Sequence, residues 1–502
     1  MNSDKAAGYG FLIRKYGLKA IPNWHSSFVS TSGTAKTVVK QDGYEQTTFP
    51  ASYWPGDSLG DHLEFALKYD GTNLGILSAL FSEVSTDDIA FWVESKPTGK
   101  YARRIWFLYE FITGMHIPLN DLTQGNYIEL LEPGEYFTAD PGIRERRQRV
   151  INNLLGNKDF CPIVRRTEAL SSIEATDIYD RCSRLLDSYP SHTVKRALGY
   201  LYNRETKSSF EIEHLKPSAS RAERFIAALE MATKKDFCSR EDLIFLQNII
   251  VDKRFRDSDY RTGQNYIGEM ISFRDQRIHY VCPKPDDIHS LMEGLISTHE
   301  NMLESASSPP PIVHAAAVAF GFVYLHPFED GNGRIHRFLI HNVLFLRKAV
   351  PEGLMFPVSA AMLRKPELYD SALENFSKPL LTLLKYDLDE LGRMKVRGDT
   401  GNFYRYIDMT VQTEALFEFM KMTVDSELPE ELDFLVSYDR AGKAVREIID
   451  MPDPKIDLLL NFCMQNNGRL SAGKRKDYFD FLTGDEVKAI EEIVKSELIE
   501  KA

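Results

Sequence analysis

The segment from Ala315 to Arg347 limits most strongly what this chain can fold into. It begins with an apolar, alanine-rich stretch that ends at Leu325, and a second stretch of helical spacing begins at about Arg334. Between them stands the sequence HPFEDGNGRIHR, residues 326–337. Two glycines around one asparagine allow positive φ, so this pattern predicts a buried helix, a tight turn and a second helix.

The expected turn has the chemistry of an anion site. Successive N–H groups around Gly331 and Gly333 would form a nest for phosphate oxygens, and the following helix N-terminus would add unpaired N–H groups. Arg334 and Arg337 are three residues apart, so they share a helix face and can reach the same anion. The pattern therefore predicts a binding site for a phosphate chain.

Two further side chains add catalytic chemistry to this site. Asp330 offers a hard oxygen ligand, and Mg²⁺ usually binds phosphates through one or two carboxylates. His326 begins the same turn, and an imidazole with a pKa near neutrality can take a proton from an attacking hydroxyl. The P-loop, the protein-kinase motifs and the Rossmann glycine pattern do not occur in the sequence, so the segment indicates a different kind of nucleotide site.

At these residues the chain resembles the Fic (Fic/Doc) family, whose signature is HPFx[D/E]GNGRxxR. The resemblance implies a mainly α fold and transfer of AMP from ATP to a Tyr, Thr or Ser hydroxyl of a target protein. It implies one role for each signature residue: His326 as general base, Phe328 as anchor of the loop, Asp330 as Mg²⁺ ligand, Gly331, Asn332 and Gly333 at the α- and β-phosphates, Arg334 on the phosphate chain and Arg337 on the γ-phosphate. The complete glycine pattern favours nucleotidyl transfer over the phosphorylation of the Doc branch.

The resemblance covers roughly residues 190–385 and implies two further sites. Ile271, Ile278 and Tyr280 fall in an expected β-hairpin that is similar to the family's flap, which docks a target segment by strand addition. Tyr369 lies where the family often has two tyrosines near the adenine. We therefore expect Tyr369 to contact the base, whose identity the sequence leaves open.

A second pattern precedes the expected core, at residues 209–214. Many Fic proteins carry an inhibitory helix with the pattern [ST]xxxE[GN], and here His214 stands in the place of Gly or Asn. Ser209 and Glu213 are four residues apart, so a helix would put them on one face. We expect an inhibitory helix near residues 205–215, in which Glu213 pairs with Arg337 and occupies the donor meant for the γ-phosphate.

Several alternatives stay open at this level. The enzyme could also remove AMP, or mainly remove it, or it could use another nucleotide. A different class of protein is a nucleotide-sensing regulator that binds DNA or a protein partner through its C-terminal helices. Residues 260–263 either line the entrance to the pocket or form a loop without function. The sequence does not decide the target, the oligomeric state or what releases the inhibition.

The 502 residues are too many for one ordinary core, so we expect three parts. They are a mixed α/β recognition or scaffold region (1–190), the Fic catalytic domain (191–385) and a helical, winged-helix-like or partner-binding region (386–502). Within the first part, we expect extended backbone at Thr37–Val39 and Ala90–Val93. We also expect an amphipathic, arginine-rich helix over Arg144–Leu155.

Composition excludes other classes of protein. Lys plus Arg is 61 and Asp plus Glu is 73, and the resulting net charge of −12 opposes bulk binding of nucleic acid, although a local basic pocket fits. The five cysteines form no CxxC motif, and the apolar run Ala315–Leu325 is shorter than the ~20 residues that span a bilayer. We therefore expect a cytoplasmic protein without a membrane segment, a disulfide framework or structural zinc.

Overall fold

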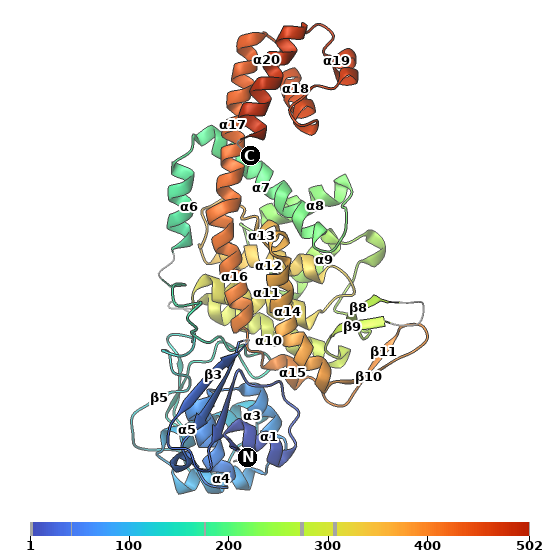
Figure 1. The fold of residues 1–502 in the computed structure, drawn as a ribbon. Helices are drawn as coiled ribbons and strands as arrows, with labels where there is room; N and C mark the ends of the chain where they lie inside the picture. The colour runs from blue at the N-terminus through green and yellow to red at the C-terminus, as the bar shows by residue number, and fades with distance from the viewer. Residues whose placement is uncertain (1–3, 42, 175–176, 272–275, 305–308, 501–502) are drawn as a thin grey trace. The chain divides into compact units, whose positions relative to one another are not determined.

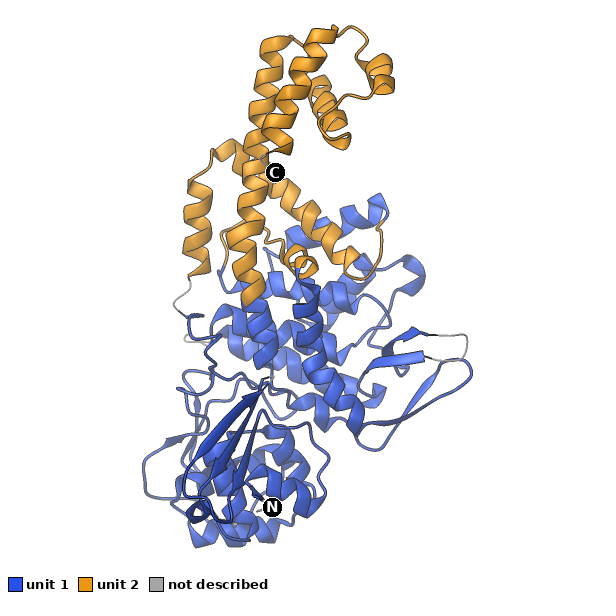
Figure 2. Ribbon diagram, viewed as in Figure 1, with its two compact units in different colours: residues 1–176, 218–349, 365–417 blue, residues 177–217, 350–364, 418–502 orange. Residues whose placement is uncertain are grey.

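The computed structural model describes residues 4–41, 43–174, 177–271, 276–304 and 309–500 (Figure 1). The chain divides into two compact units, and each combines distant segments of the sequence (Figure 2). Unit 1 comprises residues 1–176, 218–349 and 365–417, and unit 2 comprises residues 177–217, 350–364 and 418–502. The structure is mainly α with small sheets, as the resemblance implied. The expected division into three parts stays a prediction.

The N-terminal part of unit 1 packs helices on a four-stranded sheet of order β1-β2-β4-β3, in which only β2 and β4 run parallel. Thr37–Val39 lies in β3, as expected, but extended backbone at Ala90–Val93 was wrong. Ser85 and Asp88 form a capping box there, and Ile89, Trp92 and Val93 are buried at helical spacing. The elements are β1 (Lys5–Ala7), α1 (Tyr9–Tyr16), β2 (His25–Val29), β3 (Thr37–Gln41), β4 (Tyr44–Phe49), the 3₁₀-helix η1 (Ala51–Tyr53), α2 (Leu59–Phe65), the π-helix η2 (Ala66–Asp70), α3 (Leu74–Phe81), α4 (Thr86–Ser95) and α5 (Lys100–Thr113).

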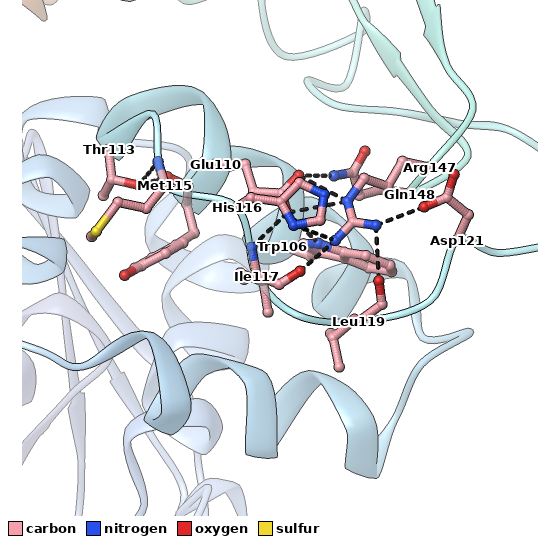
Figure 3. Close-up of polar contacts among 11 residues, drawn as sticks. Trp106, Glu110, Thr113, Met115, His116, Ile117, Leu119, Asp121, Arg147 and Gln148 are labelled. Atoms are coloured by element: carbon pink, nitrogen blue, oxygen red, sulfur yellow. Dashed lines mark hydrogen bonds and ion pairs between the residues drawn. The ribbon is translucent and has the colours of Figure 1, made fainter.

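The arginine-rich helix expected over Arg144–Leu155 was also wrong. This stretch contributes two strands to a three-stranded sheet of order β5-β7-β6, whose members are β5 (Ile128–Glu129), β6 (Ile143–Glu145) and β7 (Val150–Asn152). Figure 3 shows the reason at Arg147, whose guanidinium points into the preceding loop instead of into solvent. It donates to the carbonyls of Ile117 and Leu119 and pairs with Glu110 at 3.2 Å. The Arg147 side chain thus supplies hydrogen-bond donors to backbone carbonyls of an irregular loop. The spacing of apolar residues, from which the helix was predicted, carries no information about such bonds.

The remainder of unit 1 contains the expected buried helix, the turn, the second helix and the hairpin. Every residue of α11 from Ile312 to Leu325 is buried. Two hairpins lie side by side, because the Tyr266 hydroxyl in β8 donates to the Gly392 carbonyl between β10 and β11 at 3.0 Å (Figure 1). The elements are α8 (Ala219–Met231), α9 (Arg240–Ile250), η3 (Lys253–Phe255), β8 (Tyr266–Met270), β9 (Gln276–Val281), α10 (Pro285–Glu304), α11 (Pro311–Leu325), α12 (Asn332–Leu346), α14 (Pro366–Leu383), β10 (Lys385–Leu388), β11 (Met394–Arg397), α15 (Asn402–Arg405) and α16 (Thr410–Met422), which continues into unit 2.

Unit 2 is helical in its described residues, and a buried ion cluster ties its segments together. Glu427 is fully buried and pairs with Arg204 of α7 and with Arg364 of α13, the latter at 2.9 Å. Glu205 accepts hydrogen bonds from the backbone N–H and the hydroxyl of Ser359. The elements are α6 (Ile178–Asp187), α7 (Ser191–Glu211), α13 (Val358–Arg364), η4 (Thr423–Glu427), α17 (Leu428–Ile448), α18 (Asp453–Gln465), α19 (Ala472–Tyr478), α20 (Gly484–Val494) and η5 (Lys495–Ile499). None of the helices described combines the length and the hydrophobicity needed to cross a lipid bilayer.

Candidate active site

The turn between α11 and α12 closes on itself through one side chain. The side-chain oxygen of Asn332 accepts from the Phe328 N–H at 3.0 Å, and its amide donates to the Phe328 carbonyl at 2.7 Å. Phe328 is fully buried, so the loop has a hydrophobic anchor. Gly331 has φ 92°, and a Cβ there would stand 3.0 Å from Val251. The loop therefore needs glycine at residue 331 and an amide at residue 332.

His326 ends α11 in the left-handed region, with φ 49° and ψ 57°. Its Nδ1 lies 3.1 Å from the Val323 carbonyl, and since a carbonyl only accepts, Nδ1 carries the proton. Nε2 then holds the lone pair that a general base needs. Burial, opposed by the bond to Val323, lowers the pKa of His326 to about 4, so the ring is neutral at pH 7.

Arg261 belongs to residues 260–263, for which the sequence left open an entrance to the pocket or a loop without function, and its contact with His326 was not expected. Its Nε donates to the His326 carbonyl at 2.8 Å, and its other two nitrogens donate to the carbonyls of Gly263 and Pro283 at 2.7 and 2.6 Å. The side chain is buried, and burial lowers the pKa of its guanidinium. Arg261 and His326 are 65 residues apart, and no spacing rule connects them. The segment at residues 260–263 thus contributes a side chain that holds the backbone of the turn at His326.

Asp330 and Arg334 form an ion pair at the start of α12. Asp330 Oδ1 accepts from Arg334 at 2.7 Å and from the Gly331 N–H at 2.6 Å. Arg334 is fully buried, whereas 46% of the Asp330 side chain is exposed. An exposed carboxylate beside a loop of N–H groups is a donor set that fits Mg²⁺ held together with phosphates and water. Among the described residues, no group of three or more His, Cys, Asp or Glu side chains could hold a metal ion.

Arg337 lies one turn after Arg334 on α12, and both side chains are buried. Asn265, ahead of β8, donates from its side-chain amide to the Glu329 carbonyl at 3.4 Å. The structure therefore brings together the turn residues expected from the signature, from His326 to Arg337, beside the start of the hairpin.

The hairpin β8–β9 forms where the flap was expected, but its residues divide into two groups. Ile271 is 65% exposed and Ile278 is half-buried. Tyr280 is buried, and its hydroxyl donates to the Tyr324 carbonyl in α11. The Tyr280 side chain therefore anchors the hairpin to α11, and the docking role of these three residues stays a prediction. Most of the expected turn, residues 272–275, lies outside the described residues.

Tyr369 lies in α14 and is buried. Its ring stacks on His336 of α12, with 6.1 Å between the ring centroids and 29° between the planes. The Nδ1 of His336 donates to the Ala319 carbonyl at 2.8 Å, and burial lowers its pKa to about 3. The contact of Tyr369 with a base stays a prediction.

The expected inhibitory residues lie in unit 2. Ser209 is in the last turn of α7, but the helix ends at Glu211, so Glu213 stands in the following turn, where its N–H donates to the Phe210 carbonyl. His214 has φ 54°, in the left-handed region. The family pattern has Gly or Asn at this position, and those residues adopt that region most readily. His214 thus takes the conformation that the pattern selects.

A comparison with protein families gives one match. Residues 237–344 match the family described as Fic/DOC. The matched range includes the whole turn at residues 326–337, α9 and the hairpin β8–β9, and it leaves out α7.

Curated relatives named protein adenylyltransferase Fic resemble the middle of the chain. That of Drosophila virilis is 27% identical over 191 residues, covering 38% of this chain and 31% of the relative. That of Culex quinquefasciatus is 25% identical over 229 residues, covering 41% and 42%. The chain thus spans less than half of the length of these relatives.

Two solved structures share lower identity with the chain. A Fic family protein from Desulfovibrio desulfuricans G20 is 18% identical with a TM-score of 0.40, covering 64% of this chain and 98% of that one. A Fic domain containing signaling protein from Bacteroides thetaiotaomicron is 14% identical with a TM-score of 0.37, covering 53% and 96%.

Proposed function

Because residues 237–344 match the Fic/DOC family, we propose that the chain is a protein adenylyltransferase. It would transfer AMP from ATP to a Tyr, Thr or Ser hydroxyl of a target protein and release pyrophosphate. The observation that carries this proposal is the segment at residues 326–337. It brings together an imidazole whose Nε2 holds the lone pair, Gly331 at positive φ, a partly exposed Asp330 and two arginines at the start of α12.

In this mechanism, His326 accepts the hydroxyl proton at Nε2 while the oxygen attacks the α-phosphate. The N–H groups around Gly331 and Gly333, together with the N-terminus of α12, would bind the phosphate oxygens. Arg334 and Arg337 would balance the charge of the leaving pyrophosphate. Asp330 would hold Mg²⁺, which supplies positive charge between the phosphates when it is bound. Catalysis would then rest on positioning and charge.

We also propose that the enzyme is inhibited by its own Glu213, through a pair with Arg337 that takes the γ-phosphate donor. Two observations support this. The pattern Ser209–Glu213 resembles the family's inhibitory helix, and His214 has the left-handed conformation that Gly or Asn adopts most readily at this position of the pattern. In such an arrangement ATP could bind with its α-phosphate poorly aligned for attack.

Target docking would use the exposed side of the hairpin β8–β9, with Ile271 and Ile278 beside an extended segment of the target. A cytoplasmic location would suit the five cysteines, which are all free and buried.

The direct test is incubation of the Glu213→Gly chain with Mg²⁺ and each of the four nucleoside triphosphates, followed by mass spectrometry. We expect an adduct of about 329 Da, the mass of AMP less water, with ATP alone. The same chain with His326→Ala should bind ATP and form no adduct. An adduct that survives His326→Ala would remove His326 as the base, and equal labelling with and without Glu213→Gly would remove the inhibitory role.

A further inference from the structure

Arg221 contacts the same carbonyl as Arg334 of the turn at residues 326–337, although Arg221 lies outside the signature. It belongs to the first turn of α8, and its guanidinium reaches the Ile250 carbonyl at the end of α9 at 3.5 Å. Arg334 reaches the same carbonyl oxygen at 3.4 Å. Because both nitrogens lie so close to one oxygen, the two guanidinium groups are less than about 7 Å apart, a separation that one phosphate group can bridge.

The simplest role for Arg221 is to cap α9, because a cation is favourable at a helix C-terminus. The distance from Arg221 to the Ile250 carbonyl indicates that this capping bond is weak. A distance of 3.5 Å is at the limit of a hydrogen bond, whereas Arg334 reaches Asp330 at 2.7 Å. Burial lowers the pKa of Arg221, and the positive charge of Arg334 lowers it further, against the carboxylates of Asp330 and Asp252. Two arginines held this close are suited to an anion that both can bind.

The position of Arg221 also indicates which part of a nucleotide it would meet. Arg334 bonds to Asp330 and shares the Ile250 carbonyl with Arg221. His326, at the other end of the turn, contacts Val323 and Arg261. Since the attacked α-phosphate must lie near His326, the side of Arg334 and Arg221 is that of the leaving phosphates.

We propose that Arg221 is a further ligand of the β- and γ-phosphates and forms, with Arg334 and Arg337, a clamp of three arginines around the leaving group. The proposal rests on the proposed function, because it takes ATP as the substrate. It adds a positioning contact from α8, which lies outside the segment that matches the family.

The test measures nucleotide binding in the full chain carrying Glu213→Gly and His326→Ala, so that no turnover occurs. Isothermal titration calorimetry with Mg²⁺ compares ATP with AMP, which lacks the β- and γ-phosphates. We expect Arg221→Ala to weaken ATP binding about tenfold or more, as for one lost charge-assisted bond, and to change AMP binding by less than about twofold. Arg221→Lys should have an ATP affinity between those of the parent and of Arg221→Ala, because lysine keeps the charge but lacks the planar guanidinium that donates two parallel hydrogen bonds.

Arg224→Ala is the matched control, since it removes the same charge from the same helix and its guanidinium bonds to the Ser220 carbonyl of α8 itself. It should leave the affinity for both nucleotides unchanged within about twofold. Unchanged ATP binding in a folded Arg221→Ala chain would overturn the proposal, and so would an equal loss for ATP and AMP. Suppose that ATP binds and that Arg221→Ala weakens this binding, but that the Glu213→Gly chain with His326 intact transfers no AMP. The proposed function then fails, and the contact of Arg221 with the phosphates stands. If no nucleoside triphosphate binds to the parent, both fail.

Discussion

Replacement of Arg261 by methionine should separate the rate of AMP transfer from the affinity for ATP. Methionine roughly keeps the volume of the side chain and removes its donors to the carbonyls of His326, Gly263 and Pro283. The left-handed backbone of His326, at φ 49°, costs about 1–2 kcal/mol in a residue other than glycine. The bond from Arg261 is charge-assisted and stabilises this conformation by roughly 1.5–3 kcal/mol.

Without that bond, the strained conformer should lose most of its population to relaxed ones. A change of about 1.5–3 kcal/mol corresponds to a factor of roughly 10 to 150 in population, so kcat should fall by about that factor. The affinity for ATP should change less than about threefold, because Asn332 closes the phosphate loop through its own bonds. The buried Pro283 carbonyl and two more accessible carbonyls also lose a donor, so the free energy of unfolding should fall by about 1–3 kcal/mol.

The assay is the initial rate of labelled AMP incorporation at saturating ATP in the Glu213→Gly chain, with circular dichroism to confirm folding. Arg261→Lys keeps one donor and should recover part of the rate even if the methionine variant unfolds. Arg240→Met is the control, because Arg240 forms a solvent-exposed pair with Asp259, and exposed pairs contribute little to stability. A folded Arg261→Met chain with kcat within about twofold of its parent would refute the positioning role.

Three other perturbations have expected outcomes. Asn332→Ala removes both bonds to the Phe328 backbone, so ATP binding measured by calorimetry should weaken at least about tenfold and the melting temperature should fall. Glu427→Ala removes a buried carboxylate from Arg204 and Arg364, which keep their pairs with Glu431 and Glu430, so it should destabilise unit 2 by about 1–3 kcal/mol in urea unfolding and, by loosening α7, raise auto-modification above that of the unaltered chain. The pKa of His326 is about 4, and the charged groups that act on it are Arg261 and Asp330, so the rate limited by this base should stay level from pH 8 to about pH 5 and fall only toward pH 4. The unfolded chain protonates this imidazole near pH 6.5, so the contribution of His326 to stability is lost between about pH 6.5 and pH 4, which titration of the unfolding free energy can follow.

Much of the candidate site was predictable because it is local in the chain. The end of α11, the glycine turn and the start of α12 occupy consecutive residues, and the loop closes through a bond between residues four apart. Positive φ at Gly331 and the shared face of Arg334 and Arg337 depend on residue type and spacing alone. The same holds for the buried run of α11, whose length and hydrophobicity identify a core helix.

The predictions that failed concern side chains whose partners are distant. Arg144–Leu155 has helical spacing, yet Arg147 is bound to carbonyls about 30 residues earlier in the chain. Tyr280 was named only as part of the expected flap, and the bond from its hydroxyl to a carbonyl of α11, 44 residues away, was not foreseen. A hydrogen bond to a backbone carbonyl uses an acceptor that every residue carries. The residue types in the sequence therefore do not indicate which carbonyl a distant side chain will bind.

The sequence by itself determined the chemistry of the turn, because glycine conformation, helix spacing and residue type act over a few consecutive positions. Only the tertiary structure decided what supports that turn. Arg261 reaches His326 across 65 residues, and Arg334 meets the end of α9 across 84 residues, where Arg221 also arrives. Folding brings these groups together through the hydrophobic effect, which is non-directional. Which arginine bonds to which carbonyl therefore depends on how whole helices pack and not on a local sequence pattern.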